Sequence, residues 1–285
     1  MREGKPSFTA AAVAAARSIA GVDPLALALV DGALAAVARV GRTGRGPAAV
    51  VNVATLGLVD HIEMRTRAID AALRAGVEAG LRQLVVLGAG LDARAWRMPE
   101  LAGVHVFEVD HPSTQAFKRA RVGDRVPDAR DVRFVAVDFG KDALADALAG
   151  AGHDAQAPTF WIWEGVTPYL PMPAIRATLA AVAERSARES RLAVTYGTPT
   201  GSPLGPAAVR VARVAFRVLG EELLGLLTPE AMRDELHAVG FRLLDDLSAT
   251  EWGERHGTGK RRLLLVDEHL AVAISDERPR ESRVA

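Results

Sequence analysis

The 285-residue chain contains no cysteine. This absence excludes disulfide bonds, thiolate metal sites and a cysteine nucleophile. It also agrees with a reducing compartment, so we expect a cytoplasmic protein and predict no metal site.

The chain also lacks an excess of either charge, because 35 lysines and arginines balance 35 aspartates and glutamates. No overall field therefore favours nucleic acid or an anionic membrane. There is no run of about twenty apolar residues that could span a bilayer. The alanine-rich start has no leucine-rich signal core and is interrupted by Arg17. We expect no nucleic-acid or membrane partner; the composition predicts no oligomeric state.

Apolar residues make up 49% of the chain, enough for a sizeable core. Short apolar runs alternate with segments long enough for crossover helices, which predicts an α/β fold with a parallel sheet. The two last strands are expected to pair antiparallel. The predicted strands are 84–87, 104–109, 132–137, 159–163, 192–196, 241–247 and 263–266.

No repeat or clear linker divides the sequence, so we predict a single domain over 1–285 with helical additions. Helices are expected over 7–40, 60–79, 206–227 and after Thr228, with a glycine-rich break at 41–50. The predicted parts are a helical cover (1–59), a cofactor-binding core (60–196), a lid (197–227), a late helix and strands (228–275) and a loose tail (276–285).

The segment LRQLVVLGAGLDARAW (81–96) runs from a buried strand into Gly88, Ala89 and Gly90. Ligands bind beyond the carboxyl ends of parallel strands, and glycine lets a ligand approach the backbone closely. A helix starting near 91–93 is expected to direct its amides at that ligand. The pattern also matches the dinucleotide fingerprint G-x-G-x-x-A, and a tight turn without any ligand is the plain alternative.

Acidic residues end the next three predicted strands. Asp110 ends the second, where it can accept both hydroxyls of a ribose, and Glu108 shares its face. Asp138 and Phe139 end the third, suited to an adenine amino group and ring. Glu164 ends the fourth. Each alone is as consistent with a surface carboxylate, but their repetition at one edge indicates a ligand site.

Basic, imidazole and phenol side chains offer further candidates. Arg65 and Arg67 precede the first strand, and arginine presents a planar fork to a carboxylate, although a solvated helix face is the better explanation from the pattern alone. Substrate candidates are His111, beside Asp110, and Tyr169 and Tyr196, whose alternative is core packing. No histidine is distinguished as a general base, so no catalytic residue is assigned.

The segments MRTRAID, RQLVVLGAGLDARAWRM, VFEVDHP, VDF and WEGVTPYLP together resemble the leucine carboxyl methyltransferase-like family of class I S-adenosylmethionine-dependent methyltransferases, a branch with many bacterial enzymes of secondary metabolism. The resemblance implies a Rossmann-like, doubly wound seven-stranded sheet with the last strand antiparallel. It also implies the roles of the cofactor-binding residues: Arg65 for the methionine carboxylate, Gly88, Ala89 and Gly90 along the methionine, Asp110 at the ribose, Asp138 and Phe139 at adenine, and Glu164 near the amino group.

The resemblance therefore predicts an O-methyltransferase for a small molecule, with a carboxylate as first expected acceptor and a phenol or other hydroxyl as second. A nicotinamide-dependent dehydrogenase is the rival enzyme. The non-enzyme alternative is a binding protein that keeps the cofactor pocket but has lost turnover.

Overall fold

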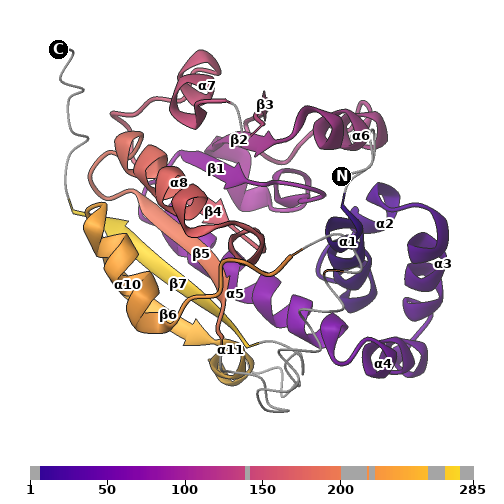
Figure 1. Ribbon diagram of the computed structural model, residues 1–285. Coiled ribbons are helices and arrows are strands. Elements are labelled where there is room, and N and C mark those ends of the chain that lie inside the picture. The colour runs from indigo at the N-terminus through magenta and orange to yellow at the C-terminus, as the bar shows by residue number, and fades with distance from the viewer. Residues whose placement is uncertain (1–6, 139–141, 200–216, 218–221, 256–266, 277–285) are drawn as a thin grey trace.

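The computed structural model describes residues 7–138, 142–199, 217, 222–255 and 267–276. Its centre is a seven-stranded sheet in the order β3-β2-β1-β4-β5-β7-β6 (Figure 1). Within this sheet β7 runs in the direction opposite to the other six strands, which confirms the predicted fold class. The strands are β1 (Gln83–Leu87), β2 (His105–Asp110), β3 (Asp131–Ala136), β4 (Thr159–Trp163), β5 (Arg191–Gly197), β6 (Phe241–Ser248) and β7 (Glu268–Ser275).

The central strands β1 and β4 are buried along their whole length, as expected for parallel strands covered on both faces. Six of the seven predicted strands correspond to observed ones within a few residues. The seventh, predicted at 263–266, lies outside the described residues, and β7 begins at Glu268. Chain order reverses between β1 and β4, so a ligand crevice is expected at their carboxyl ends.

Helices cover both faces of the sheet. Side chains alternate along each strand, so Val85 and Leu87 of β1 belong to one apolar cluster, and Leu84 and Val86 belong to another. The first cluster includes residues of α7 (Leu144–Gly150), α8 (Met172–Glu184) and α10 (Pro229–Ala238). The second includes residues of α5 (Leu58–Glu78) and α11 (Ala249–Arg255). Helix α6 (Pro112–Val122) makes the crossover from β2 to β3.

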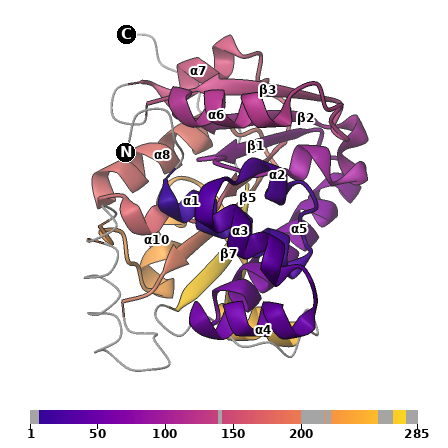
Figure 2. The same ribbon diagram turned by 90° about the vertical axis from the view of Figure 1, so that its right-hand side faces the viewer.

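In the described part of the chain, four helices precede α5: α1 (Phe8–Ala20), α2 (Ala26–Leu29), α3 (Gly32–Gly41) and α4 (Arg45–Ala54). Figure 2, which views the molecule from their side, shows α1, α3 and α4 in front of the sheet. The predicted break at 41–50 is therefore wrong in extent, because α4 begins at Arg45. Pro47 does not prevent this, since a proline in the first turn of a helix costs no hydrogen bond.

The α-helix predicted to start at 91–93 is not formed. The chain turns through Gly90 (φ +50°) into a short 3₁₀ helix, Arg94–Trp96. The side chain of Asp92 accepts the backbone N–H of Arg94 at 2.7 Å, and the Arg94 side chain is drawn inward by buried carboxylates. These side-chain bonds replace helical ones, so this segment does not direct the amides of an α-helix at the ligand site.

Most of the predicted lid and its helix, and the tail, lie outside the described residues. Residues 222–227 are described and form no helix, so the helix prediction is wrong at that end. The backbone N–H groups of Leu224 and Gly225 donate to Pro168 O, which places this segment beside the loop after β4. The division of the chain into parts stays a prediction. Among the described helices, none combines the length and apolarity needed to cross a bilayer.

Polar side chains cluster where β5, β6 and β7 meet. The Tyr196 hydroxyl donates to Asp246 at 2.7 Å, and His269 Nδ1 lies 3.2 Å from the same carboxylate. His269 Nε2 lies 3.6 Å from Asp267. Burial alone would lower the pKa of His269, but the two aspartates outweigh it and raise that pKa to about 9.

This cluster predicts a pH-dependent stability. A histidine whose pKa is raised on folding stabilises the fold fully below its unfolded pKa of about 6.5. That contribution is lost as the pH rises through about 9. Between pH 6 and 9.5, the unfolding free energy of the wild type should therefore fall more than that of His269→Gln, measured by urea denaturation. Equal losses in the two proteins would contradict the assignment.

Candidate cofactor site

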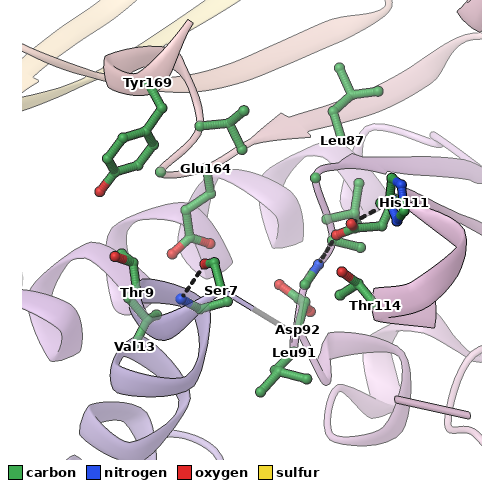
Figure 3. Close-up of a pocket in the computed structure, with 18 of the residues that line it drawn as sticks. Ser7, Thr9, Val13, Leu87, Leu91, Asp92, His111, Thr114, Glu164 and Tyr169 are labelled. Atoms are coloured by element: carbon green, nitrogen blue, oxygen red, sulfur yellow. Dashed lines mark hydrogen bonds between the residues drawn. The ribbon is translucent and has the colours of Figure 1, made fainter. Parts of the chain in front are cut away.

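A cavity of about 430 Å³ opens at the carboxyl ends of β1, β2 and β4, with α1 as its opposite wall. Figure 3 shows Ser7, Thr9 and Tyr169 on one side and His111 and Thr114 on the other, with Glu164 and Asp92 between them. Of the residues singled out from the sequence as cofactor-binding, all that the structure describes line this cavity: Arg65, Gly88, Ala89, Gly90, Asp110, Asp138 and Glu164. Phe139 lies outside the described residues.

The end of β2 and the glycine turn are joined by the carboxylate of Asp110. One of its oxygens accepts the N–H of Gly90 at 2.5 Å, and the other accepts the N–H of His111 at 2.6 Å. Burial raises the pKa of Asp110 above its ordinary value, although these two amides act in the opposite direction. Each carboxylate oxygen has a second lone pair, so Asp110 can accept two hydroxyls while remaining anchored.

The turn tolerates no side chain at Gly88. Its φ is +64°, and a Cβ there would lie 2.6 Å from Val166 Cγ2, in the loop after β4 that also lines the cavity. Gly123 has a similar φ of +57° with nothing near its missing Cβ. The two positions share the backbone strain but differ in the steric conflict.

We therefore predict that Gly88→Ala and Gly123→Ala each destabilise the protein by about 1 kcal/mol or more, the cost of left-handed backbone for an L-residue. Only Gly88→Ala should also weaken ligand binding, by about tenfold, because its methyl group would displace Val166 and the turn, which both line the cavity. Thermal unfolding and calorimetric titration with S-adenosylhomocysteine measure the two effects. Equal ligand affinities in the two variants would contradict the role given to Gly88.

Three guanidinium groups surround the carboxylate of Glu164. Oε1 accepts from Arg17 Nη2 at 2.7 Å and from Arg65 Nε at 2.9 Å, and Oε2 accepts from Arg94 Nη1 at 2.9 Å. Burial alone would raise the pKa of Glu164, but the three arginines hold it well below its ordinary value. Glu164 therefore stays ionised and lines the cavity, and its predicted place near the ligand's amino group stays a prediction.

The arginines are in turn held by other carboxylates. Arg94 contacts Asp92 and donates Nε to Asp70 at 2.7 Å. Arg65 Nη1 lies 3.1 Å from both oxygens of Glu268, at the start of β7. Arg67 has a different environment, because its side chain is half exposed and pairs with Glu63 on the same helix. Of the two arginines in MRTRAID, the structure thus places only Arg65 at the cavity.

Residues 7–183 match the family model described as leucine carboxyl methyltransferase, which covers more than half of the chain. The chain belongs to the leucine carboxyl methyltransferase family. Related proteins are provisionally named S-adenosyl-L-methionine-dependent methyltransferases. One from Streptomyces coelicolor is 42% identical over 144 residues, 50% of each chain. One from Mycobacterium marinum is 46% identical over 136 residues, 47% of this chain and 43% of the relative.

The chain thus spans about half the length of the curated relatives that it matches. Solved structures agree on the fold. A DUF574 family protein from Streptomyces avermitilis has a TM-score of 0.66 at 14% identity, covering 95% of this chain and 98% of that one. A provisionally named methyltransferase from Thermobifida fusca has a TM-score of 0.62 at 17% identity, covering 96% of both chains. The comparisons confirm the resemblance stated from the motifs and S-adenosylmethionine as the cofactor of this class.

The substrate candidates of this family member occupy different environments. Tyr169 lies in the 3₁₀ helix Thr167–Tyr169 and lines the cavity. Tyr196 is fully buried, bonds Asp246 and is not among the lining residues, so the structure places it in the core. Its prediction as a substrate residue is corrected accordingly.

His111 lines the cavity but serves as the N-cap of α6. Its Nδ1 accepts the backbone N–H of Ser113 at 3.2 Å and lies 2.8 Å from the Ser113 hydroxyl. A neutral imidazole that accepts at Nδ1 carries its proton on Nε2. Nδ1 is thus engaged by Ser113, and no acid–base role is assigned to His111.

Glu108 does not reach the cavity, although it shares a strand face with Asp110. It is buried and forms an ion pair with Lys118 of α6. Burial raises the pKa of Glu108 to about 7, against the opposing charge of Lys118. The pair anchors α6 to β2 behind Asp110.

Among the charged residues at the site, the sequence reasoning assigned no role to Arg17 and Asp92, which line the cavity, or to Glu268 behind Arg65. Arg17 interrupts an alanine run, and that isolated charge on an apolar helix is a usable signal. Asp92 follows the glycine turn within a quoted motif. Glu268 stands in a charged stretch far along the chain, and nothing in its local pattern marks it.

Proposed function

We propose that the protein is an S-adenosylmethionine-dependent O-methyltransferase acting on a small molecule, with a carboxylate as the first expected acceptor and a hydroxyl as the second. The observation that carries the proposal is the convergence of the glycine turn, the anchored Asp110 carboxylate and the Arg65 guanidinium on one cavity, in a chain of this family. The dehydrogenase alternative has no comparable support.

The residues present suit this cofactor. Asp110 offers acceptors for ribose hydroxyls, and Asp138 stands at the neighbouring strand end for adenine. Arg65 Nη2 has no hydrogen-bond partner among the described residues, so it can bind a carboxylate. The cavity volume, about 430 Å³, is sufficient for a nucleoside carrying an amino-acid side arm.

S-adenosylmethionine, when bound, supplies a methyl group on a sulfonium and a thioether leaving group. In transfer to an oxygen acceptor, the new C–O bond would form as the C–S bond breaks, with the electron pair of the C–S bond going to sulfur. The protein must hold the two reactants in line. Helix α1 covers one side of the cavity, and shielding the reactants from water would favour attack by an anion on a cation because charge is lost in the transition state.

We keep the carboxylate as first acceptor because it needs no base, in a site where His111 Nδ1 already contacts Ser113. A carboxylate is already ionised at neutral pH and needs no base, whereas a phenol or alcohol must lose a proton. Burial alone would raise the pKa values of Asp92 and Glu164, but the nearby arginines lower them by more. Both carboxylates are therefore poor bases. The secondary-metabolism setting and the cytoplasmic location remain predictions.

Calorimetric titration with S-adenosylhomocysteine and with NADH tests the cofactor, and we expect binding of the former only. Incubation with methyl-labelled cofactor and panels of carboxylic acids and phenols tests the acceptor. Mild alkali releases labelled methanol from a methyl ester but not from a methyl ether. Binding of NADH alone would overturn the proposal, and cofactor binding without transfer to any acceptor would indicate a silent binding protein.

A further inference from the structure

We propose that Glu268 is a positioning residue that orients Arg65 toward the carboxylate end of the bound cofactor. The inference rests on the proposed function. It adds to the cofactor site a residue from β7, a strand outside the segment 7–183 that matches the family model.

The first support is that the nitrogens of the Arg65 guanidinium have different partners. Nε donates to Glu164 at 2.9 Å, and Nη1 lies 3.1 Å from each oxygen of Glu268. These bonds fix the guanidinium plane from two directions. Nη2 is left without a partner among the described residues, beside Gly165, where an added Cβ would lie 3.6 Å from it. The bare backbone of Gly165 keeps that nitrogen accessible from the cavity, which both residues line.

The second support is that Glu268 is itself held in place. His61 Nε2 lies 2.6 Å from its Oε2. Burial alone would raise the pKa of Glu268, but Arg65 and His61 lower it to about 2, so the carboxylate only accepts. The proton between them therefore belongs to His61 Nε2. His61 of α5 thus holds Glu268 of β7, and Glu268 in turn holds Arg65 of α5.

The third support is the cost of the alternative arrangement. Arg65 is only 6% exposed, and without Glu268 its Nη1 would lose the partner that it has among the described residues. A buried charged donor left unpaired seeks another acceptor, and Glu164 is the carboxylate that Arg65 already contacts. Rotation toward Glu164 would turn Nη2 away from its present direction. The expected consequence is a selective loss of contact with the ligand carboxylate.

The test compares two ligands on one protein. S-adenosylhomocysteine carries the amino-acid carboxylate, and 5′-methylthioadenosine is the same nucleoside thioether without it. In Glu268→Gln we expect the affinity for S-adenosylhomocysteine to fall about 10- to 100-fold, the range of a lost charged hydrogen bond. The affinity for methylthioadenosine should change less than about threefold, because that ligand makes no contact with Arg65. A merely structural role would weaken both ligands equally, and that outcome, or no change in either, overturns the proposal.

Two further variants make the comparison specific. Asp246→Asn disturbs the same end of β6 and β7 through His269 without touching Arg65, and it should leave the ratio of the two affinities unchanged. In an Arg65→Gln background, adding Glu268→Gln should have no further effect on S-adenosylhomocysteine, since a residue acting through another is non-additive with it. Additive losses would contradict the assignment.

Where Glu268→Gln does not fold, Glu268→Asp serves instead. It keeps the charge but withdraws the carboxylate by one methylene, and the same selective loss is expected. The proposed function fails in a distinguishable way, because the wild type would then bind S-adenosylhomocysteine no more tightly than methylthioadenosine or not at all.

Discussion

Asp110→Ala is expected to weaken binding of S-adenosylhomocysteine by about 100-fold or more. The carboxylate is anchored by the amides of Gly90 and His111 in the position where ribose hydroxyls are expected. Two hydrogen bonds to a charged acceptor, at roughly 1.5–3 kcal/mol each, account for that loss. Removing the anchor also frees the glycine turn. Calorimetric titration measures the affinity directly.

Asp131→Ala is the matched control for this variant. Asp131 begins β3, at the amino ends of the parallel strands and so away from the cavity. There it pairs with His105 at 2.8 Å and is partly exposed. It should leave ligand affinity unchanged. An Asp110→Ala protein that is folded and binds with wild-type affinity would refute both the ribose role and the placement of the cofactor along this edge.

Glu164→Gln is expected to lower the unfolding free energy by about 3–5 kcal/mol, as when one partner of a buried ion pair is removed. Three buried guanidinium groups would lose their shared negative charge at once. Because Arg17 belongs to α1 and Arg65 to α5, the loss should also loosen the wall of the cavity. Urea denaturation with the wild type in parallel gives the difference.

Glu235→Gln provides the same chemical change in a different environment. Glu235 pairs with Arg176, whose side chain is 64% exposed, at 2.6 Å. Exposed pairs contribute about 0–1 kcal/mol, so this variant should be nearly neutral. Similar losses of unfolding free energy in Glu164→Gln and Glu235→Gln would show that burial and the three arginines around Glu164 do not matter to stability.

Much of the fold could be predicted because its signals are local. The buried runs that became β1 and β4, and the proline that starts α10 after Thr228, are readable from neighbouring residues alone. The missing helix after β1 shows the limit of such signals. Helix formation there is overridden by Asp92 and by the inward Arg94, whose partners Asp70 and Glu164 lie on other parts of the chain.

The candidate site was likewise only partly predictable from local signals. Acids at the ends of parallel strands meet at one sheet edge whatever the loops do, so Asp110, Asp138 and Glu164 could be grouped from sequence. Tyr196 follows the same rule of position, yet its side chain points into the core and bonds Asp246. Both faces of β5 are buried, and only the folded structure showed that Tyr196 belongs to the apolar cluster with α8 and α10.

By itself the sequence determined the sheet, the turn at Gly88–Gly90 and the row of acids at its edge, because each depends on residues adjacent in the chain. The tertiary structure decided how those acids are neutralised. Arg17, Arg65 and Glu268 come from α1, α5 and β7, and they meet at Glu164 or beside it only after the chain has folded. Ion pairing in a buried site depends on distances of a few ångströms between groups remote in sequence, and no local pattern encodes those distances.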